Sequence, residues 1–409
     1  MKKSLLYLLL SLSLPVVASQ PRKVLVIGID GTRSDALQQA NTPNLDSIVA
    51  NGLYSWNSWH CGITVSAPSW SDIMCGVWEA KHGVTSNSYT NSNYNSYPYF
   101  VKRAKELKPN LYAVQVTEWA PMSDNVYNDG WDEKIKVPDG EGEPTEQAAI
   151  TALQNPDLDA LFVYFDAVDL TGHSSGFNPN NPNYIAAIEG VDSHIGPILT
   201  ALRSRPNYAS ENWLILLTTD HGGIGTGHGG GSDEERNIWW MGCGSAVPHQ
   251  ELVGGDPGSY QLQYQLLNGV SAVNPSILAN TPVQTDIAVT ALHHLIYDLG
   301  IRPENQPAWN LDGKSWLDKI SGIPAVEENN RLAIYPNPSD DIVTVWFQND
   351  FGDQVNYSLI DMQGKEMTIK PVFESKSKIS FDVKGLASGN YTMELSTNQK
   401  KFYGSIIKK

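Results

Sequence analysis

Four short runs of apolar and β-branched residues recur along the first part of the chain, and polar or helix-forming segments separate them. The runs are Lys23–Ile29, Tyr112–Val116, Leu161–Phe165 and Trp213–Thr219. Continuously apolar strands of this kind are typical of a parallel sheet that is covered on both faces. The sequence therefore predicts an α/β fold with a mainly parallel sheet and helices on both faces.

Helix signals lie between and after these runs. Thr42 followed by Pro43 is typical of a helix start, and Gly52 marks the end of that helix. A second amphipathic pattern runs from Asp286 to Leu299. Both patterns fit helices that pack one apolar face against the sheet.

Two of the apolar runs end directly in ionisable residues. Asp30 follows the first run, and Asp220 and His221 follow the fourth, each group being followed by glycine. The carboxyl ends of the strands are where ligands bind in open α/β sheets. Alone, Asp30 is more typical of a helix cap or turn than of a ligand site. A charged pair at the tip of a buried strand, by contrast, is costly unless it has a function.

Three further residues have the chemistry of metal ligands or nucleophiles. Asp169 and His173 are four residues apart, so one helical turn would bring them together, although a structural pair remains an alternative. His228 stands among glycines, which also fits an ordinary polar loop. Ser66 precedes an apolar stretch and would lie at a helix N-terminus, which favours bound anions. Thr64 is the alternative nucleophile.

These segments occur in an order that resembles the alkaline phosphatase superfamily. The resemblance covers Lys23–Trp316 and is closest to the type I phosphodiesterase/nucleotide pyrophosphatase branch and its sulfatase-like relatives. The matching motifs are Asp30-Gly31-Thr32-Arg33-Ser34-Asp35, Thr42-Pro43-Asn44-Leu45-Asp46, Ser66-Ala67-Pro68-Ser69, Lys81-His82-Gly83-Val84, Asp169-Leu170-Thr171-Gly172-His173, Asp220-His221-Gly222 and Gly227-His228-Gly229.

The resemblance implies a serine hydrolase with two metal ions. One Zn²⁺ would be held by Asp169, His173 and His228. The other would be held by Asp30, Asp220 and His221, with the Ser66 hydroxyl as nucleophile and remaining ligand. Such mixed nitrogen and oxygen ligands suit Zn²⁺, and Mn²⁺ or Fe²⁺ could take its place. The implied substrate is a small anionic ester, and the family type favours a diester or nucleotide-type substrate over a simple monoester.

The sequence departs from its relatives near the nucleophile. Nucleotide pyrophosphatases usually carry threonine where this chain has Ser66. Sulfatases need an arginine where Trp70 stands, which argues against conversion of Ser66 to formylglycine and against sulfatase activity. Alternatives are a phosphomonoesterase, phosphonate hydrolase or sulfatase of the same superfamily. An inactive metal-stabilised binding protein is a further alternative, with a tyrosine face on the expected surface loop Thr85–Tyr99. The tyrosines of that face are Tyr89, Tyr94, Tyr97 and Tyr99.

The two ends of the chain indicate export. Residues 1–19 combine Lys2 and Lys3 with an apolar run and a small-residue exit, which predicts a signal peptide. After residues 20–322, predicted as the catalytic domain, residues 323–330 have the composition of a linker. Residues 331–409 show the period-2 pattern of a small β-sandwich and resemble the C-terminal sorting domain of type IX secretion substrates. We therefore expect a secreted or surface-attached protein that contacts the secretion machinery through this domain.

Charge, hydropathy and cysteine content argue against several further classes of protein. The formal net charge of −16 argues against binding a nucleic acid polymer through a basic face. No stretch after the signal peptide approaches the roughly 20 apolar residues of a transmembrane helix. Three cysteines cannot all pair with one another, although a bridge between Cys61 and Cys75 is left open.

Overall fold

The computed structural model describes residues 20–125, 130–244, 249–317, 333–335, 339–346, 356–361, 365–374, 378–396 and 401–408. The chain divides into two compact units, Met1–Gly322 and Ile323–Lys409. The predicted signal peptide and the predicted linker 323–330 lie outside the described residues. In the part of the chain that the structure describes, we find no helix long and apolar enough to cross a bilayer.

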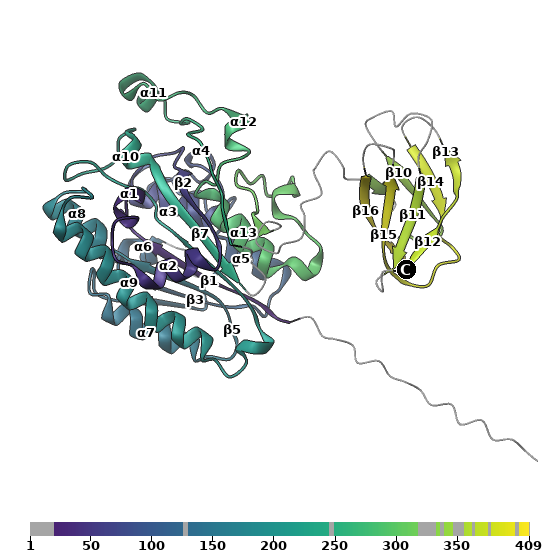
Figure 1. Ribbon diagram of the computed structural model, residues 1–409, viewed down its shortest axis with the longest axis horizontal. Coiled ribbons are helices and arrows are strands. Elements are labelled where there is room, and N and C mark those ends of the chain that lie inside the picture. The colour runs from purple at the N-terminus through teal and green to yellow at the C-terminus, as the bar shows by residue number, and fades with distance from the viewer. Residues whose placement is uncertain are drawn as a thin grey trace, which may run out of the picture. The chain divides into compact units, whose positions relative to one another are not determined.

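The first unit is built on one sheet of eight strands (Figure 1). In spatial order they are β4 (Glu133–Lys136), β3 (Tyr112–Thr117), β5 (Leu158–Phe165), β1 (Arg22–Ile29), β6 (Asn212–Thr218), β7 (Asn237–Gly244), β2 (Leu53–Trp59) and β8 (Gln250–Glu251). The first five run parallel, β7 is antiparallel to both of its neighbours, and β8 runs parallel to β2. The predicted mainly parallel sheet is confirmed, whereas the antiparallel β7 was not expected.

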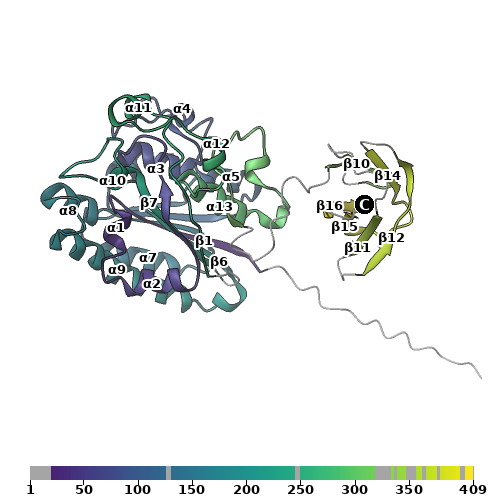
Figure 2. The ribbon, with the colours of Figure 1, turned by 45° about the horizontal axis from the view of Figure 1, so that its top comes forward.

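Helices cover both faces of this sheet, as the turned view shows (Figure 2). Alternate residues of β1 explain why its whole run is apolar: Val24 and Val26 belong to one core, and Leu25 and Ile27 to the other. The first core includes residues of α3 (Ser66–Cys75), α5 (Phe100–Leu107) and α13 (Thr285–Leu295). The second includes residues of α2 (Pro43–Ala50), α7 (Glu143–Leu153), α8 (Ala167–Ser175) and α9 (Pro182–Arg203). The remaining short helices are α1 (Ser34–Leu37), α4 (Glu79–His82), α6 (Ala120–Asn125), α10 (Asp233–Arg236), α11 (Leu262–Asn268) and α12 (Pro275–Leu278).

The segment Thr85–Tyr99 contains no helix or strand, as expected, but it is not a surface tyrosine face. Tyr89, Tyr94 and Tyr99 are buried in the first core, and the Tyr94 hydroxyl hydrogen-bonds with Ser71 of α3 at 2.7 Å. The binding face expected for an inactive surface protein is therefore wrong, because these rings fill the space beside α3 and α5 instead of meeting solvent.

The cysteine bridge that the sequence left open does not form. Cys61 and Cys75 are free, buried thiols in separate apolar clusters. Cys243 is also free and buried.

The second unit is a β-sandwich of two antiparallel four-stranded sheets. One sheet has the order β13 (Pro371–Glu374), β14 (Lys378–Asp382), β10 (Ile342–Trp346) and β9 (Ala333–Tyr335). The other has the order β12 (Glu366–Thr368), β11 (Asn356–Asp361), β15 (Gly389–Ser396) and β16 (Lys401–Lys408). Val343 and Phe381 of the first sheet share one core with Leu359 and Met393 of the second, which confirms the predicted sandwich.

Candidate active site

Polar side chains gather where the parallel strands β1, β5 and β6 end. Asp30 directly follows β1, and Asp220 and His221 follow β6. Asp169 and His173 lie on α8, the helix that comes after β5. His228 arrives from the glycine-rich loop beyond His221 and stacks on its ring with centroids 3.8 Å apart. Because parallel strands have their carboxyl ends at one edge, residues far apart in sequence become neighbours here.

Asp30, Asp220 and His221 form what we call the inner half-site. Their side chains are fully buried, and one ligand atom from each lies within 4.8 Å of the others. His221 Nε2 is 3.2 Å from Asp220 Oδ2 and 3.7 Å from Asp30 Oδ1. These two carboxylate oxygens are buried and have no hydrogen-bond partner. A buried, unpartnered carboxylate oxygen is expensive unless a cation binds it.

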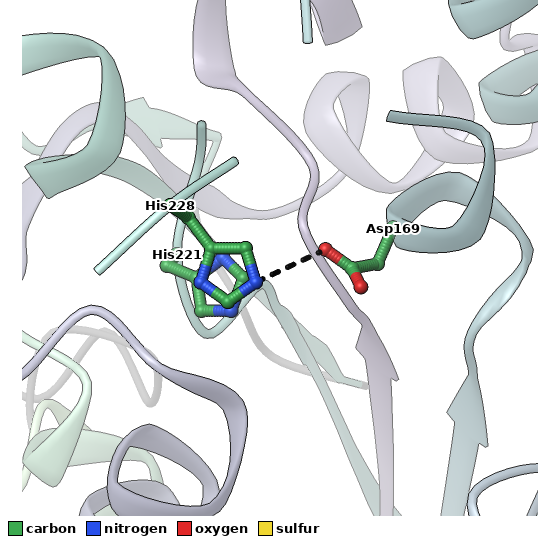
Figure 3. A group of neighbouring side chains, drawn as sticks. All are labelled: Asp169, His221 and His228. Carbon is green, nitrogen blue, oxygen red and sulfur yellow. Dashed lines mark ion pairs between the residues drawn. The ribbon is translucent and has the colours of Figure 1, made fainter. Parts of the chain in front are cut away.

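Asp169, His173 and His228 form what we call the outer half-site. His173 Nε2 lies 3.3 Å from Asp169 Oδ2 and 3.1 Å from His228 Nε2. Figure 3 shows the other oxygen of Asp169, Oδ1, directed at the His228 ring, and it lies 3.8 Å from His228 Nε2. The His228 ring in turn stacks on His221. Asp169 Oδ1 is the third buried carboxylate oxygen here without a hydrogen-bond partner. The two half-sites are therefore contiguous.

All three imidazoles are anchored through the same ring atom, Nδ1. The Nδ1 atoms of His173, His221 and His228 lie 3.0, 2.9 and 2.8 Å from the carbonyl oxygens of Thr226, Gly222 and Thr64, respectively. A carbonyl oxygen only accepts, so each Nδ1 carries the proton and each neutral ring has its lone pair on Nε2. Two such lone pairs, on His173 and His228, face each other at 3.1 Å. That contact is repulsive unless a proton or a metal ion lies between them.

Negative charge is concentrated at this edge. Burial, followed by the charges of Asp220 and Asp169, raises the pKa of Asp30 well above its usual range. Burial likewise raises the pKa of Asp220. The hydrogen bond with Asp169 raises the pKa of His173 to about 9, whereas burial holds the pKa of His221 well below its usual range. Among the described residues, no lysine or arginine pairs with the acids of either half-site. The donor set and its uncompensated charge therefore fit divalent cations.

Ser66 is the first residue of α3, and its Oγ lies 3.4 Å from His221 Nε2. Its side chain thus faces the inner half-site from the N-terminal end of a helix, where the helix dipole favours an anion. Thr64, the alternative nucleophile, donates its hydroxyl to the carbonyl of Gly230 at 2.7 Å. Ser66 is therefore the better placed hydroxyl.

The sequence reasoning missed several neighbours of these residues. Asp166 directly follows β5, and one of its carboxylate oxygens lies within 4.8 Å of oxygens of Asp30 and Asp169. The rule that pointed to Asp30, an acidic residue directly after a buried strand, would have found Asp166 as well. Asn87 accepts the Ala67 N–H through Oδ1 at 2.9 Å, which places its amide beside Ser66. Nothing in the local pattern around Asn87 indicates this contact, since it joins a loop to a helix start.

The loop of residues 175–181 lines a cavity of about 570 Å³ together with Arg33, Ile224, Gly225 and Thr226. Phe177 of this loop packs edge-on against His173, with ring centroids 5.3 Å apart. The cavity therefore adjoins the outer half-site.

Comparison with protein families gives two matches. The sequence model of the type I phosphodiesterase/nucleotide pyrophosphatase family matches residues 24–120 and 112–229. The model of the secretion system C-terminal sorting domain matches residues 333–409. Every residue of both half-sites, together with Ser66, falls inside the first match.

Individual relatives agree with these matches. A bis(5′-adenosyl)-triphosphatase of Bos taurus is 23% identical over 225 residues, which cover 50% of this chain and 48% of the relative. Human ectonucleotide pyrophosphatase/phosphodiesterase family member 7 is 22% identical over 222 residues, which cover 49% and 47%. The chain thus spans about half the length of the curated relatives it matches. A solved 2-O GAG sulfatase matches this chain with a TM-score of 0.54 at 14% identity, and the match covers 89% of this chain and 85% of the sulfatase chain. This likeness shows the alkaline phosphatase-like fold.

Proposed function

Because the chain belongs to the type I phosphodiesterase/nucleotide pyrophosphatase family, we propose that it is a phosphodiesterase that uses Ser66 and two zinc ions. Its C-terminal sorting domain makes it a protein that is secreted or attached to the cell surface. The proposed substrate is a small anionic phosphoric ester outside the cytoplasm, and the proposed partner of the second unit is the secretion machinery.

One observation carries this proposal. Three buried carboxylate oxygens without hydrogen-bond partners, on Asp30, Asp169 and Asp220, lie among the Nε2 atoms of three imidazoles that are anchored through Nδ1. Structural acids and histidines would instead be satisfied by donors or placed apart. The inner half-site would hold one metal ion, together with the Ser66 hydroxyl, and the outer half-site would hold the other. The mixed nitrogen and oxygen donors suit Zn²⁺, and Mn²⁺ or Fe²⁺ could replace it.

Metal ions bound there would lower the pKa of the serine hydroxyl and stabilise negative charge on the ester oxygens. Ser66 Oγ forms a bond to phosphorus while the bond from phosphorus to the leaving oxygen breaks, and the alcohol or nucleotide product departs with a proton. Water then hydrolyses the phosphoserine and restores the hydroxyl. The Asn87 side-chain NH₂ group would donate to a non-bridging oxygen of the ester, because the Asn87 Oδ1 already accepts the Ala67 N–H.

The names of the relatives favour a diester or nucleotide-type substrate over a simple monoester. The likeness to a sulfatase concerns the fold alone. Trp70 takes the place of the arginine that formylglycine formation needs, and its indole is buried in the core. We therefore place phosphodiester cleavage ahead of sulfate ester cleavage.

The test is turnover of bis-p-nitrophenyl phosphate, p-nitrophenyl phosphate and p-nitrophenyl sulfate by the purified protein, with its metal content measured in parallel. We expect about two zinc equivalents and fastest cleavage of the diester. Ser66→Ala should abolish diester cleavage, whereas Thr64→Ala should retain most of it, because Thr64 is bonded to Gly230. Intact cleavage by Ser66→Ala would show that the nucleophile is assigned wrongly. A metal-free wild type would contradict the binuclear site.

A further inference from the structure

The carboxylate of Asp30 is asymmetric in its surroundings. Its Oδ2 accepts two hydrogen bonds, one from the Trp70 indole N–H at 2.8 Å and one from the Tyr164 hydroxyl at 2.6 Å. Its Oδ1 accepts none and lies 3.7 Å from His221 Nε2. We propose that Trp70 and Tyr164 are positioning residues that fix Asp30 as a one-oxygen metal ligand of the inner half-site.

Packing leaves the Trp70 indole very little freedom. The ring lies over Gly28 of β1, where a Cβ atom would stand 2.2 Å from Trp70 Cη2. Its edges meet Phe162 and Tyr164 with ring centroids 5.9 and 5.2 Å away. Trp70 is 1% exposed. Since α3 also begins with Ser66, the same helix presents the nucleophile and, one turn later, the donor that orients Asp30.

Tyr164 restrains the same oxygen from the strand side. Tyr164 lies on β5, and its hydroxyl is also 3.1 Å from Asp166 Oδ1. The hydroxyl has one proton, which the 2.6 Å contact assigns to Asp30. Two donors on Oδ2 hold the carboxyl plane against rotation about the Cβ–Cγ bond. Oδ1 is then kept where Asp220 Oδ2 and His221 Nε2 also point.

The physical consequence is a preorganised ligand. A free aspartate can rotate and offer either oxygen or both, and a metal ion must restrict that freedom when it binds. Groups that orient a metal ligand from behind typically change metal affinity by about 10- to 100-fold. This role presupposes the proposed metal-dependent function, since it acts through Asp30 alone and touches no substrate.

The test compares Trp70→Phe with Trp240→Phe in the full chain. Trp240 is fully buried in the same core, but its indole N–H has no partner, so both variants lose similar volume and only Trp70→Phe loses a donor to Asp30. We measure zinc affinity by competition with a chelator, and the visible spectrum of the cobalt-loaded proteins. Trp70→Phe should bind one of two metal equivalents about 10- to 100-fold more weakly, with an altered cobalt spectrum. Trp240→Phe should match the wild type in both measurements.

Tyr164→Phe provides a second variant, because it removes only the hydroxyl and keeps the ring. It should weaken the same metal equivalent, so the role of the two donors stays testable even if Trp70→Phe does not fold. Unchanged zinc affinity and cobalt spectrum in Tyr164→Phe and in any folded Trp70→Phe would overturn the positioning role while leaving the proposed hydrolase intact. A wild type that binds neither zinc nor cobalt would overturn both.

Discussion

The inner and outer half-sites use the same two kinds of side chain in opposite proportions and in different settings. The inner half-site has two carboxylates and one imidazole, all with fully buried side chains. The outer half-site has one carboxylate and two imidazoles, and the His173 side chain is 45% exposed. The inner residues lie within three positions of the ends of β1 and β6, whereas the outer residues come from α8 and a glycine-rich loop.

This difference separates what the core fixes from what the surface supplies. Moving Asp30 or Asp220 would disturb the β1 and β6 strand ends, and both acids are already held by hydrogen bonds, Asp220 through the Gly31 N–H at 3.1 Å. His173 lies on the solvent-exposed side of α8, and only its contacts with Asp169, the Thr226 carbonyl and the outer-loop rings of Phe177 and His228 hold it. We therefore expect the inner half-site to keep its geometry and its metal, and the outer half-site to be the more labile.

Removing one ligand from each half-site should give the largest contrast. Asp220→Asn puts an amide where the inner half-site offers an unpartnered oxygen. We expect a loss of diester turnover on the order of 10⁴-fold, as when one member of a catalytic unit is removed. His173→Ala removes a direct ligand, so it should lower the zinc affinity of the outer half-site by at least about 100-fold, the upper end of what loss of an orienting residue costs. Excess zinc should restore much of the diester turnover of the His173→Ala variant.

The measurement is turnover against added zinc for both variants, with circular dichroism to show that each is folded. Asp220→Asn should stay inactive at every zinc concentration. Rescue of Asp220→Asn by zinc, or failure to rescue His173→Ala, would break the distinction between the two half-sites.

The same distinction decides what the sequence could predict. Asp30, Asp220 and His221 directly follow apolar strand patterns, so the strands themselves place them at the sheet edge. His228 lies in a loop whose path depends on contacts such as the one with the Thr64 carbonyl, and only resemblance to a family pointed to it. That these residues hold metal remains a prediction.

The parts that the sequence did not reveal are contacts between distant segments. The donors to Asp30 come from residues 40 and 134 positions away, so no local spacing could pair them. Likewise, Tyr89 and Tyr94 lie in a segment with the composition of a surface loop, and only the packing beside α3 shows that they are buried. The antiparallel β7 went unnoticed because its apolar run looks the same whichever way it is paired.

Removing the metals should affect stability in a way that depends on pH and on His173. In the metal-free protein, Asp169 raises the pKa of His173 to about 9, and burial raises the pKa of Asp30 and Asp220 well above their usual range. The folded state then holds protons that the unfolded state has lost, so metal-free stability falls as pH rises from about 6.5 to 9. Bound metal replaces those protons, so the affinity of the site for metal rises as the pH rises from about 6.5 to 9.

We therefore expect the Tm difference between zinc-loaded and chelator-treated protein to grow between pH 6.5 and 9. At the high end the metal should contribute roughly 3–4 kcal/mol when free zinc is 100 to 1,000 times Kd. In chelator-treated His173→Ala, the fall in Tm with pH should be shallower, because only the carboxylates remain. A pH-independent difference, or an unchanged slope in His173→Ala, would show that the outer half-site does not exchange protons for metal.

The loop that joins the half-sites offers the smallest and most local contrast. It starts at Gly222, where a Cβ atom would lie 2.0 Å from the backbone oxygen of Glu234, and it reaches Gly227, where nothing lies within 4 Å. Gly222→Ala must shift backbone beside His221 and should cost about 1–3 kcal/mol of stability, with a parallel loss of zinc from the inner half-site. Gly227→Ala adjoins His228 but meets no atoms and needs no unusual φ, so its effect should be within about 0.5 kcal/mol or slightly stabilising. Thermal unfolding and zinc content of the two variants test this. Equal losses would mean that the inner end of the loop is no more constrained than the outer end, and that burial does not set the two half-sites apart.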